Sequence, residues 1–512
     1  MELEFSSTAV LLVTSLLFVF MALKLVKRSK TSERSLNLPP GPWKLPIIGN
    51  LHQLTNPLIH RQLRDLAMKY GPLMHLQLGE LSTVVVSSPK YAEEVMKTHD
   101  VIFASRPVLL STKILDYDST SISFSPYGSY WRQLRKICVQ ELLTMKRVQS
   151  FRPIREEEVS NLITSIASNA GSPVNLTEKF RTLIYGITSR AAFGKKSKDM
   201  EVFISAFMEA LSLSAGFNIS DLYPSIELLQ WITGIRSQLE RIHRTMDSIL
   251  EDIVNEHKSK QTTPSKVGDL QSDENEDLVD VLLKIQERGD LEVPLTADNV
   301  KAVILDVWIA GGETSATTID WTMSELLKNP LILKKAQTEV RKVFNRIGKV
   351  DESGISEMKY LKLVVKETLR FHPPVPLLVP RESRERCEIS GFNIPSKSQV
   401  IVNAWAISRD PEYWSEPEKF IPERFDDCPI DYKGTNFEFI PFGAGRRICP
   451  GSSYGVTNIE LPLALLLYYF DWKLPNDMKN EDLDMTETAG LAVRRKNELY
   501  VIPIPYSSPS TA

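Results

Sequence analysis

The sequence predicts a mainly α-helical protein with a minor β part, an α+β fold, in one large domain that follows a single N-terminal membrane anchor. Helical periodicity recurs along most of the chain, whereas strand-like runs are few and short. Helices and strands do not alternate regularly, which argues against a doubly wound parallel sheet. An uncharged apolar run near the amino terminus is long enough to cross a bilayer once.

The overall composition is that of a globular protein. Hydrophobic residues make up 42% of the 512 residues, a share that excludes a disordered, collagenous or polytopic membrane chain. The net charge of −3 offers no positive field over the whole chain, so the sequence gives no support for nucleic-acid binding. Four cysteines are too few for a disulfide scaffold, and an important cysteine is therefore more readily a ligand or a nucleophile.

The amino-terminal segment, residues 1–26, is predicted to be a transmembrane anchor. Its uncharged run from Phe5 to Leu23 would span about 28 Å as a helix, close to the hydrocarbon thickness of about 30 Å. Basic residues follow this run and acidic residues precede it, so the positive-inside rule places the rest of the chain in the cytosol. A cleaved signal peptide is the alternative, but the basic start and the small-residue cleavage site that it needs are missing.

Residues 27–42 form a basic linker that ends in a proline-rich hinge, Pro39-Pro40-Gly41-Pro42. Proline restricts its own φ and disfavours helix before it, so the hinge is either a rigid spacer or an ordinary extended linker. The body, residues 43–512, is predicted to be the catalytic domain. Its clearest elements are helices at 59–69, 90–98, 130–142, 201–214, 235–258, 296–328, 331–345, 359–370 and 453–469 and strands at 73–78, 82–87 and 399–403.

The strongest chemical signal is the loop at 441–451 (PFGAGRRICPG), which contains Cys449. Glycines let the backbone approach a flat cofactor, and Arg447 can pair with a carboxylate. The predicted helix 453–469 begins directly after the cysteine, and its amino-terminal N–H groups favour negative charge on sulfur. The alternative for a single cysteine in such a loop is a buried, inert thiol.

The long predicted helix 296–328 carries Ala-Gly-Gly-Glu-Thr-Ser at 310–315. Each interior glycine costs a helix about 1 kcal/mol, so a compensating role is expected. The two glycines could admit a flat cofactor, and the adjacent acid and alcohol of Glu313 and Thr314 could relay protons. The alternative is close helix packing at the glycines and a threonine hydroxyl bonded to its own backbone.

These two segments resemble the cytochrome P450 superfamily of haem-thiolate monooxygenases, over the body from about Leu36 onward. The loop agrees with the family's F-x-x-G-x-R-x-C-x-G pattern, and the helix is similar to its A-G-x-[DE]-T-[TS] pattern, with Gly312-Glu313 as a variation. Longer stretches, such as NAWAISRDPEYW, resemble subfamily D of plant family 71.

The resemblance implies a haem b cofactor with Cys449 as the axial iron ligand, and catalytic proton delivery by Thr314 and Glu313. It also implies that Glu367, Arg370 and Arg424 form one buried structural network near the haem loop. The cofactor-binding residues that it implies are Trp131, Arg135, Arg381, Phe442, Gly445, Arg447 and Gly451.

The resemblance also indicates which regions would line a substrate pocket, and nearly all the side chains there are apolar. They are Leu109, Leu110, Ile114, Leu305, Ile309, Ala310, Val375, Leu378, Val379 and Leu491. A pocket of this kind favours a hydrophobic small molecule. The resemblance makes a terpenoid the first expectation, with a flavonoid 6-hydroxylase or an indole-alkaloid hydroxylase as alternatives.

The chain contains no flavin or nicotinamide fingerprint, so electrons from NADPH have to arrive through a separate flavoprotein reductase. We expect a single-pass protein of the endoplasmic reticulum membrane with a cytosolic catalytic domain and no nucleic-acid partner. Two alternatives belong to other classes, a haem-thiolate hydroperoxide isomerase and a non-catalytic membrane-tethered partner protein. A basic face on the thiolate side would receive the reductase, and its members are Arg132, Lys136, Lys146, Arg147 and Arg446.

Overall fold

The computed structural model describes residues 15, 37–196, 199–213, 218–262 and 276–506. The predicted anchor and most of the basic linker lie outside these residues. Among the helices of the described residues, none combines the length and the apolar character needed to cross a membrane.

The helices outnumber and outsize the strands, as the sequence predicts. The α-helices are α2 (Ile59–Tyr70), α3 (Pro89–Glu93), α4 (Leu110–Leu115), α5 (Ser129–Ile137), α6 (Met145–Ser150), α7 (Arg152–Ala167), α8 (Leu176–Phe193), α9 (Met200–Leu213), α10 (Ile219–Leu222), α11 (Leu228–Ile232), α12 (Ile235–Thr262), α13 (Leu278–Arg288), α14 (Ala297–Lys328), α15 (Pro330–Ile347), α16 (Lys359–Phe371), α17 (Ala404–Ile407) and α18 (Ser452–Tyr469). The strands are β1 (Leu73–Leu78), β2 (Leu81–Val86), β3 (Val174–Asn175), β4 (Arg381–Glu382), β5 (Cys387–Ile389), β6 (Phe392–Ile394), β7 (Gln399–Val402), β8 (Phe470–Lys473) and β9 (Tyr500–Pro505).

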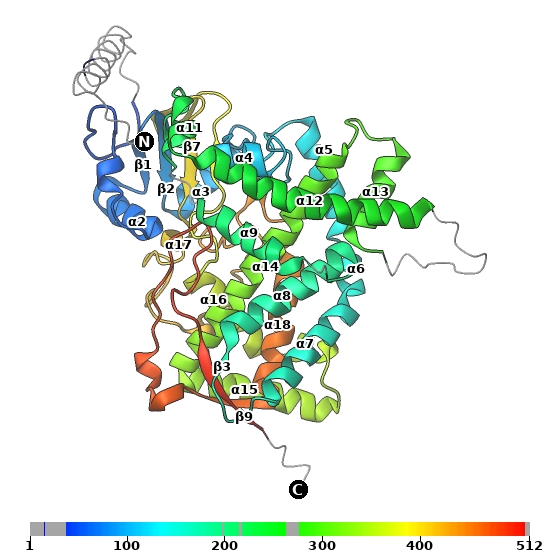
Figure 1. Cartoon of the computed structure of the whole chain (residues 1–512). Helices are drawn as coiled ribbons and strands as arrows, with labels where there is room; N and C mark the ends of the chain where they lie inside the picture. Colours follow the sequence, from blue (N-terminus) through cyan, green and yellow to red (C-terminus); the bar gives the residue numbers. More distant parts are fainter. Residues whose placement is uncertain (1–14, 16–36, 197–198, 214–217, 263–275, 507–512) are drawn as a thin grey trace, which may run out of the picture.

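Helix α14 runs through the middle of the molecule and organises its packing (Figure 1). It packs against α8 along much of its length and also contacts α16 and α18. A capping box starts the helix, because Thr296 and Asn299 each bond the backbone N–H of the other. Most of its side chains are buried on every side, which fits a helix enclosed by others rather than one facing solvent.

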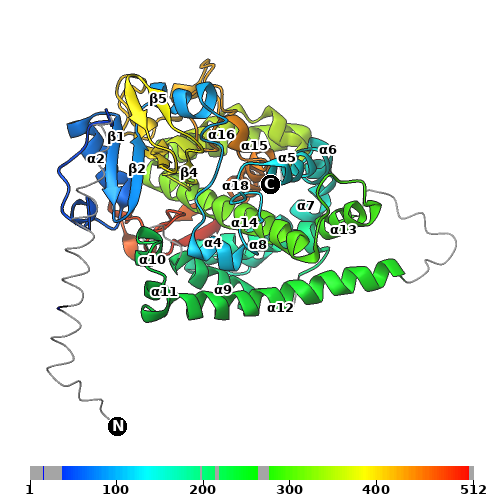
Figure 2. The same cartoon turned by 90° about the horizontal axis from the view of Figure 1, so that it is seen from above.

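Strands β1, β2, β4 and β5 lie at one side of the helical body, as the view from above shows (Figure 2). Strands β3 and β9 lie apart from them, at the other end of the molecule near α15 (Figure 1). The largest sheet has the order β1-β2-β7-β4. Within it β1 pairs with β2 in an antiparallel hairpin, while β2 and β7 run parallel although more than 300 residues separate them. Two smaller sheets, β3-β9-β8 and β5-β6, complete the β part.

Most predicted elements are present within a few residues of their expected ends, and two differ in kind. The ends of the helices expected at 90–98 and 130–142 are π-helical turns, η2 (Glu94–Thr98) and η3 (Cys138–Leu142). Two long helices, α7 and α8, were not among the predicted elements. Helix α8 is buried on most sides against α14, so its sequence lacks the one-sided pattern that periodicity detects.

Candidate active site

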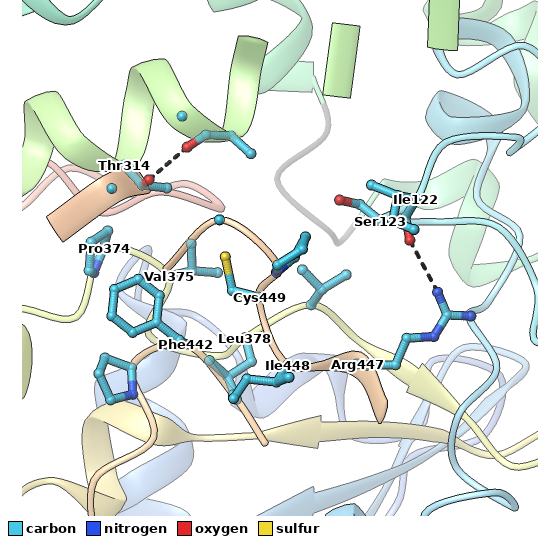
Figure 3. Close-up of a pocket in the computed structure, with 18 of the residues that line it drawn as sticks. Ile122, Ser123, Thr314, Pro374, Val375, Leu378, Phe442, Arg447, Ile448 and Cys449 are labelled. Carbon is cyan, nitrogen blue, oxygen red and sulfur yellow. Dashed lines mark hydrogen bonds between the residues drawn. The ribbon is translucent and has the colours of Figure 1, made fainter. Parts of the chain in front are cut away.

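A cavity of about 240 Å³ lies between α14 and the loop that carries Cys449. Figure 3 shows the Cys449 sulfur pointing into this space, with Thr314 on one side and Ile122 and Ser123 on the other. The wall is mostly apolar, and it includes Val375 from the segment after α16. The predicted ligand loop and the predicted proton-delivery helix therefore meet across a single cavity.

The loop around Cys449 holds the sulfur through its backbone. The Cys449 N–H donates to the carbonyl of Phe442 over 2.9 Å, and the side chains of both residues line the cavity. Burial raises the pKa of the Cys449 thiol, while the Gly451 N–H bonded to the sulfur and the charge of Arg135 oppose that rise. The N–H and the guanidinium each favour the thiolate, although the effect of burial is larger and the pKa remains raised.

Gly445 is needed for a reason other than cofactor contact. Its φ is +68°, and a Cβ at this position would lie 2.0 Å from the carbonyl oxygen of Met96. The residue does not line the cavity. Its predicted role in cofactor binding stays a prediction, and its observed role is to let the ligand loop pack against η2.

Arg447 is a buried cation at the cavity wall without an acidic partner among the described residues. It donates to the carbonyls of Ala104 over 2.7 Å, Ile122 over 3.3 Å and Ser125 over 2.6 Å. Burial, followed by repulsion from Arg381 and Arg135, lowers the pKa of Arg447 to about 9. A dianionic ligand in the cavity would relieve this repulsion.

Arg381 and Arg135 extend the positive charge along the same wall. Arg381 donates to the carbonyl of Ala444 over 2.9 Å and reaches Asp100 only at 3.5 Å. Burial lowers the pKa of Arg381 to about 10. The cluster leaves more buried positive than negative charge at this wall, a balance that the two propionates of a haem would correct. Together with the inward-facing Cys449 sulfur, the donor set of the cavity fits a haem-thiolate cofactor.

Two further residues belong to this wall, one of them predicted. Trp131 lines the cavity, and its indole N–H donates to the carbonyl of Ile122 over 3.0 Å. Its ring also lies under Arg447, with 4.1 Å between the guanidinium carbon and the ring centroid. Arg106, which the sequence analysis missed, is a further buried arginine of the same cavity.

The glycines of α14 pack closely against two tyrosines. A Cβ at Gly312 would lie 2.4 Å from the ring of Tyr185 on α8, and one at Gly311 would lie 3.2 Å from the ring of Tyr454 on α18. The Thr314 hydroxyl donates to the carbonyl of Ala310 over 2.7 Å. Both features agree with the alternative in which the glycines allow close helix packing and the threonine hydroxyl bonds its own backbone. Ala310, Gly311 and Thr314 nevertheless also face the cavity.

Glu313 faces away from the cavity that Thr314 lines. Consecutive helical residues point about 100° apart, and Glu313 lines a second, polar cavity of about 210 Å³ on another side of α14. Its carboxylate lies 3.2 Å from the Arg494 guanidinium and accepts a hydrogen bond from the Tyr185 hydroxyl over 3.3 Å. The structure therefore holds the acid and the alcohol of the predicted pair in different cavities.

The predicted substrate residues divide into two groups. Ala310, Val375, Leu378 and Val379 line the cavity. Leu305 and Leu110 instead belong to a hydrophobic core cluster, against which Ile114 and Ile309 pack. Leu109 precedes the short helix α4, Leu491 lies half-buried near the C-terminal strand, and neither lines the cavity.

Asp306 and Ser123 are polar cavity residues that the sequence analysis missed. Asp306 lies on α14 two turns before Thr314 and accepts hydrogen bonds from the backbone N–H and the hydroxyl of Ser123. An acidic residue on the cavity-facing stripe that contains Ala310 and Thr314 could have been found by counting back along the helix in steps of four.

The structure brings Glu367, Arg370 and Arg424 together away from the cavity. Arg370 binds both carboxylate oxygens of Glu367, at 2.7 and 2.8 Å, and Arg424 binds the same carboxylate at 3.0 Å. Glu367 and Arg370 have no exposed side-chain surface, and Arg370 also donates to the carbonyls of Ser408 and Pro417. The network ties α16 to the segment that leads into the ligand loop.

Comparison with known proteins agrees with this arrangement. A family model described as cytochrome P450 matches residues 39–502. The chain is 58% identical to cytochrome P450 71D11 of Lotus japonicus over 95% of this chain and 99% of that protein. It is 55% identical to tabersonine 16-hydroxylase 2 of Catharanthus roseus, over 100% of this chain and 99% of that protein. Premnaspirodiene oxygenase of Hyoscyamus muticus is 50% identical, over 97% of this chain and 98% of that protein.

Solved structures show the same fold. A zebra fish cytochrome P450 with abiraterone superimposes with a TM-score of 0.73 at 25% identity, covering 88% of this chain and all of that one. The predicted resemblance to plant subfamily 71D is confirmed by the relatives that carry this designation. Matches of this extent show that the chain belongs to the cytochrome P450 family, with the haem-thiolate cofactor, the redox partner and the monooxygenase activity of that family.

Proposed function

We propose that this monooxygenase uses NADPH-derived electrons and dioxygen to hydroxylate or epoxidise a hydrophobic plant specialised metabolite. The observation that carries the proposal is the single cavity that joins the Cys449 sulfur, a wall of buried arginines and Thr314 beneath apolar side chains. Such a cavity can hold a flat dianionic cofactor and a small apolar molecule above it.

The chain's own residues would hold the cofactor in named places. Cys449 would supply the thiolate ligand, Arg447, Arg381 and Arg135 would pair with the propionates, and Phe442 would line the cofactor side of the cavity. Haem with a thiolate ligand supplies dioxygen activation, in which one oxygen atom enters the substrate and the other leaves as water. The apolar wall at Val375 and neighbouring residues excludes bulk water from this chemistry.

We propose that Thr314 and Glu313 divide proton delivery between the two cavities. Thr314 holds a hydroxyl at the reaction cavity, while Glu313 exchanges protons with the polar cavity that it lines. For transfer, the Glu313 side chain has to leave the Arg494 guanidinium and turn toward Thr314. The ion pair at 3.2 Å thus keeps the acid away from the reaction cavity until it is needed.

Three substrate classes are candidates for this cavity. A terpenoid is the expectation from the sequence resemblance, and the relative named premnaspirodiene oxygenase agrees with that class. Tabersonine 16-hydroxylase 2 supports the indole-alkaloid alternative by its name. A flavonoid hydroxylase stays as the third prediction.

We further propose a single-pass protein of the endoplasmic reticulum membrane that docks an NADPH-dependent flavoprotein reductase on the thiolate side. Arg132, Lys136 and Lys146 are exposed there and available for electrostatic steering. Arg147 and Arg446 contribute less, because they lie against Glu276 and Asp100, respectively. The apolar run before residue 26 supports the anchor by its length and flanking charges.

The test is turnover of the full chain in yeast microsomes with a plant reductase, NADPH and isotopically labelled dioxygen. Panels of terpenoids, indole alkaloids and flavonoids would be screened by mass spectrometry. We expect one labelled oxygen atom in the product of an accepted substrate, and none when NADPH is omitted. Product that forms without NADPH, or without label, would contradict the monooxygenase proposal for this cavity.

Thr314→Ala is expected to uncouple NADPH consumption from product formation. Removing the hydroxyl leaves the cavity without its proton-donating group, so peroxide should be released in place of product, with coupling falling about tenfold or more. Peroxide and product are measured per NADPH consumed. Thr318→Ala is the matched control, because Thr318 lies one turn further along the same cavity wall. Equal coupling in wild type and Thr314→Ala would make the proposed role of Thr314 wrong.

A further inference from the structure

Asp306 is a carboxylate in an otherwise mostly apolar cavity wall. It lies on α14, deep within the fold, yet its side chain keeps some accessible surface because it faces the cavity. Its neighbours along the same helix face, Val307 and Ala310, are apolar. Asp306 is therefore accessible to a bound molecule and not to the outer surface of the protein.

The hydrogen bonds of Asp306 bring no cation into direct contact with its carboxylate, and the nearby charge of Arg106 compensates it only from a distance. Its two oxygens accept from the backbone N–H of Ser123 over 2.8 Å and from the Ser123 hydroxyl over 2.7 Å. Within the described part of the chain, no ion pair at 4.0 Å or less involves this carboxylate, and Arg106 is the cation whose charge acts on it from further away. Arg106 lies in the same wall, but its guanidinium donates to the carbonyls of Ser123, Val379 and Pro380.

A second buried acid, Asp116, lies near Asp306 and differs from it in ionisation. Burial and the proximity of Asp306 raise the pKa of Asp116 to about 8, so Asp116 is mainly protonated at neutral pH. Burial, opposed by the bonds from Ser123 and the charge of Arg106, raises the pKa of Asp306 to about 6. Asp306 is then mainly ionised at neutral pH, and a buried carboxylate without a close cation is costly. A cationic group on a ligand in the cavity would supply the missing partner.

We propose that Asp306 is a specificity-determining residue that binds the protonated amine of the substrate, which is thus a hydrophobic molecule with a basic nitrogen. The inference rests on the proposed function and names the substrate class of the same cavity. Asp306 and Thr314 lie about 12 Å apart along the axis of α14, so the ammonium lies away from Thr314. This placement favours the alkaloid alternative over a terpenoid hydrocarbon, because a terpenoid hydrocarbon has no nitrogen to ionise.

The test compares two probes of nearly equal shape that differ in charge. N,N-dimethyl-1-adamantanamine is a cation at neutral pH, and 1-isopropyladamantane replaces its nitrogen with carbon. Dissociation constants are measured with the full-length haem-loaded protein in detergent, by titrating the change in haem spin state. We expect the wild type to bind the amine about tenfold or more tightly than the hydrocarbon, because a desolvated ion pair forms only with the amine.

Three variants separate charge recognition from support of the loop at Ser123. Asp306→Asn keeps the shape and should lose the preference for the amine, with the hydrocarbon affinity changed less than about threefold. Asp306→Glu keeps the charge and should retain part of the preference. Ser123→Ala removes one hydrogen bond to Asp306 but no charge, and should keep the preference. A variant is included only if its reduced, carbon monoxide-bound form shows the thiolate band. The same spectrum tests the haem assignment separately from substrate binding.

Two results would overturn the proposal. Asp306→Asn could weaken both probes equally, in which case Asp306 only supports the loop. The wild type could bind both probes with equal affinity, in which case the charge is not used for recognition. Either result would leave the monooxygenase function in place, because the labelled-dioxygen experiment does not depend on the substrate's charge.

Discussion

Cys449→Ala is expected to abolish thiolate ligation and, with it, essentially all monooxygenase turnover. The Cys449 sulfur faces the cavity and accepts the Gly451 N–H, and no other described cysteine lines that cavity. Alanine can neither ligate iron nor supply the electron density that a thiolate gives to it. The measurement is the carbon monoxide difference spectrum of the reduced protein in yeast microsomes, in which the strongly red-shifted thiolate band should vanish.

Cys428→Ala serves as the matched control for that experiment. Cys428 is a half-buried free cysteine that does not line the cavity. We expect this variant to keep the thiolate band and full turnover. A Cys449→Ala protein that retains both would refute the ligand assignment. Correctly folded wild-type protein without any bound haem would instead bring forward the non-catalytic alternative.

Arg370→Ala is expected to destabilise the catalytic domain by about 3–5 kcal/mol. The substitution leaves the fully buried Glu367 carboxylate with Arg424 as its remaining cationic partner, and it also strips donors from the carbonyls of Ser408 and Pro417. A carboxylate that cannot reach water needs this compensation more than an exposed one does. The measurement is the temperature at which half of the thiolate band is lost on heating.

Arg346→Ala is the control for burial. Arg346 pairs with Glu357 at the surface, where both side chains are about half exposed. Exposed pairs contribute only about 0–1 kcal/mol, so the loss temperature should hardly change. Equal shifts in the two variants would show that the Glu367 network contributes no more than a surface ion pair.

Periodicity predicted the long helices that have one solvent-facing side, such as α15 and α16, and short strand-like runs predicted β1 and β2. Helix α8 escaped prediction because its neighbours enclose it, and enclosure removes the contrast between polar and apolar faces. The π-helical turn η2 also escaped prediction. It accommodates the approach of the ligand loop at Gly445, a contact between segments nearly 350 residues apart.

Among the residues expected at the site, those of the loop with Cys449 were also easier to predict than those that depend on helix packing. Four residues of the loop at 441–451 line the cavity, namely Phe442, Arg447, Cys449 and Gly451, whereas Gly445 of the same loop does not. Substrate residues were harder to predict, since α14 is buried all round and hydrophobicity does not distinguish its cavity face from its core face. Leu305 therefore faces the core, although Ala310 on the same helix faces the cavity.

The sequence by itself determined the family and the positions of most long helices, and it predicts the cysteine ligand, because these depend on short segments and on local periodicity. Tertiary structure alone decided which side chains share a cavity. It turned Glu313 toward Arg494 and away from Thr314, and it placed Asp306 in the wall of the Cys449 cavity with no ion pair at 4.0 Å or less among the described residues. The physical reason is that burial and charge pairing depend on packing between distant segments, which no local pattern encodes.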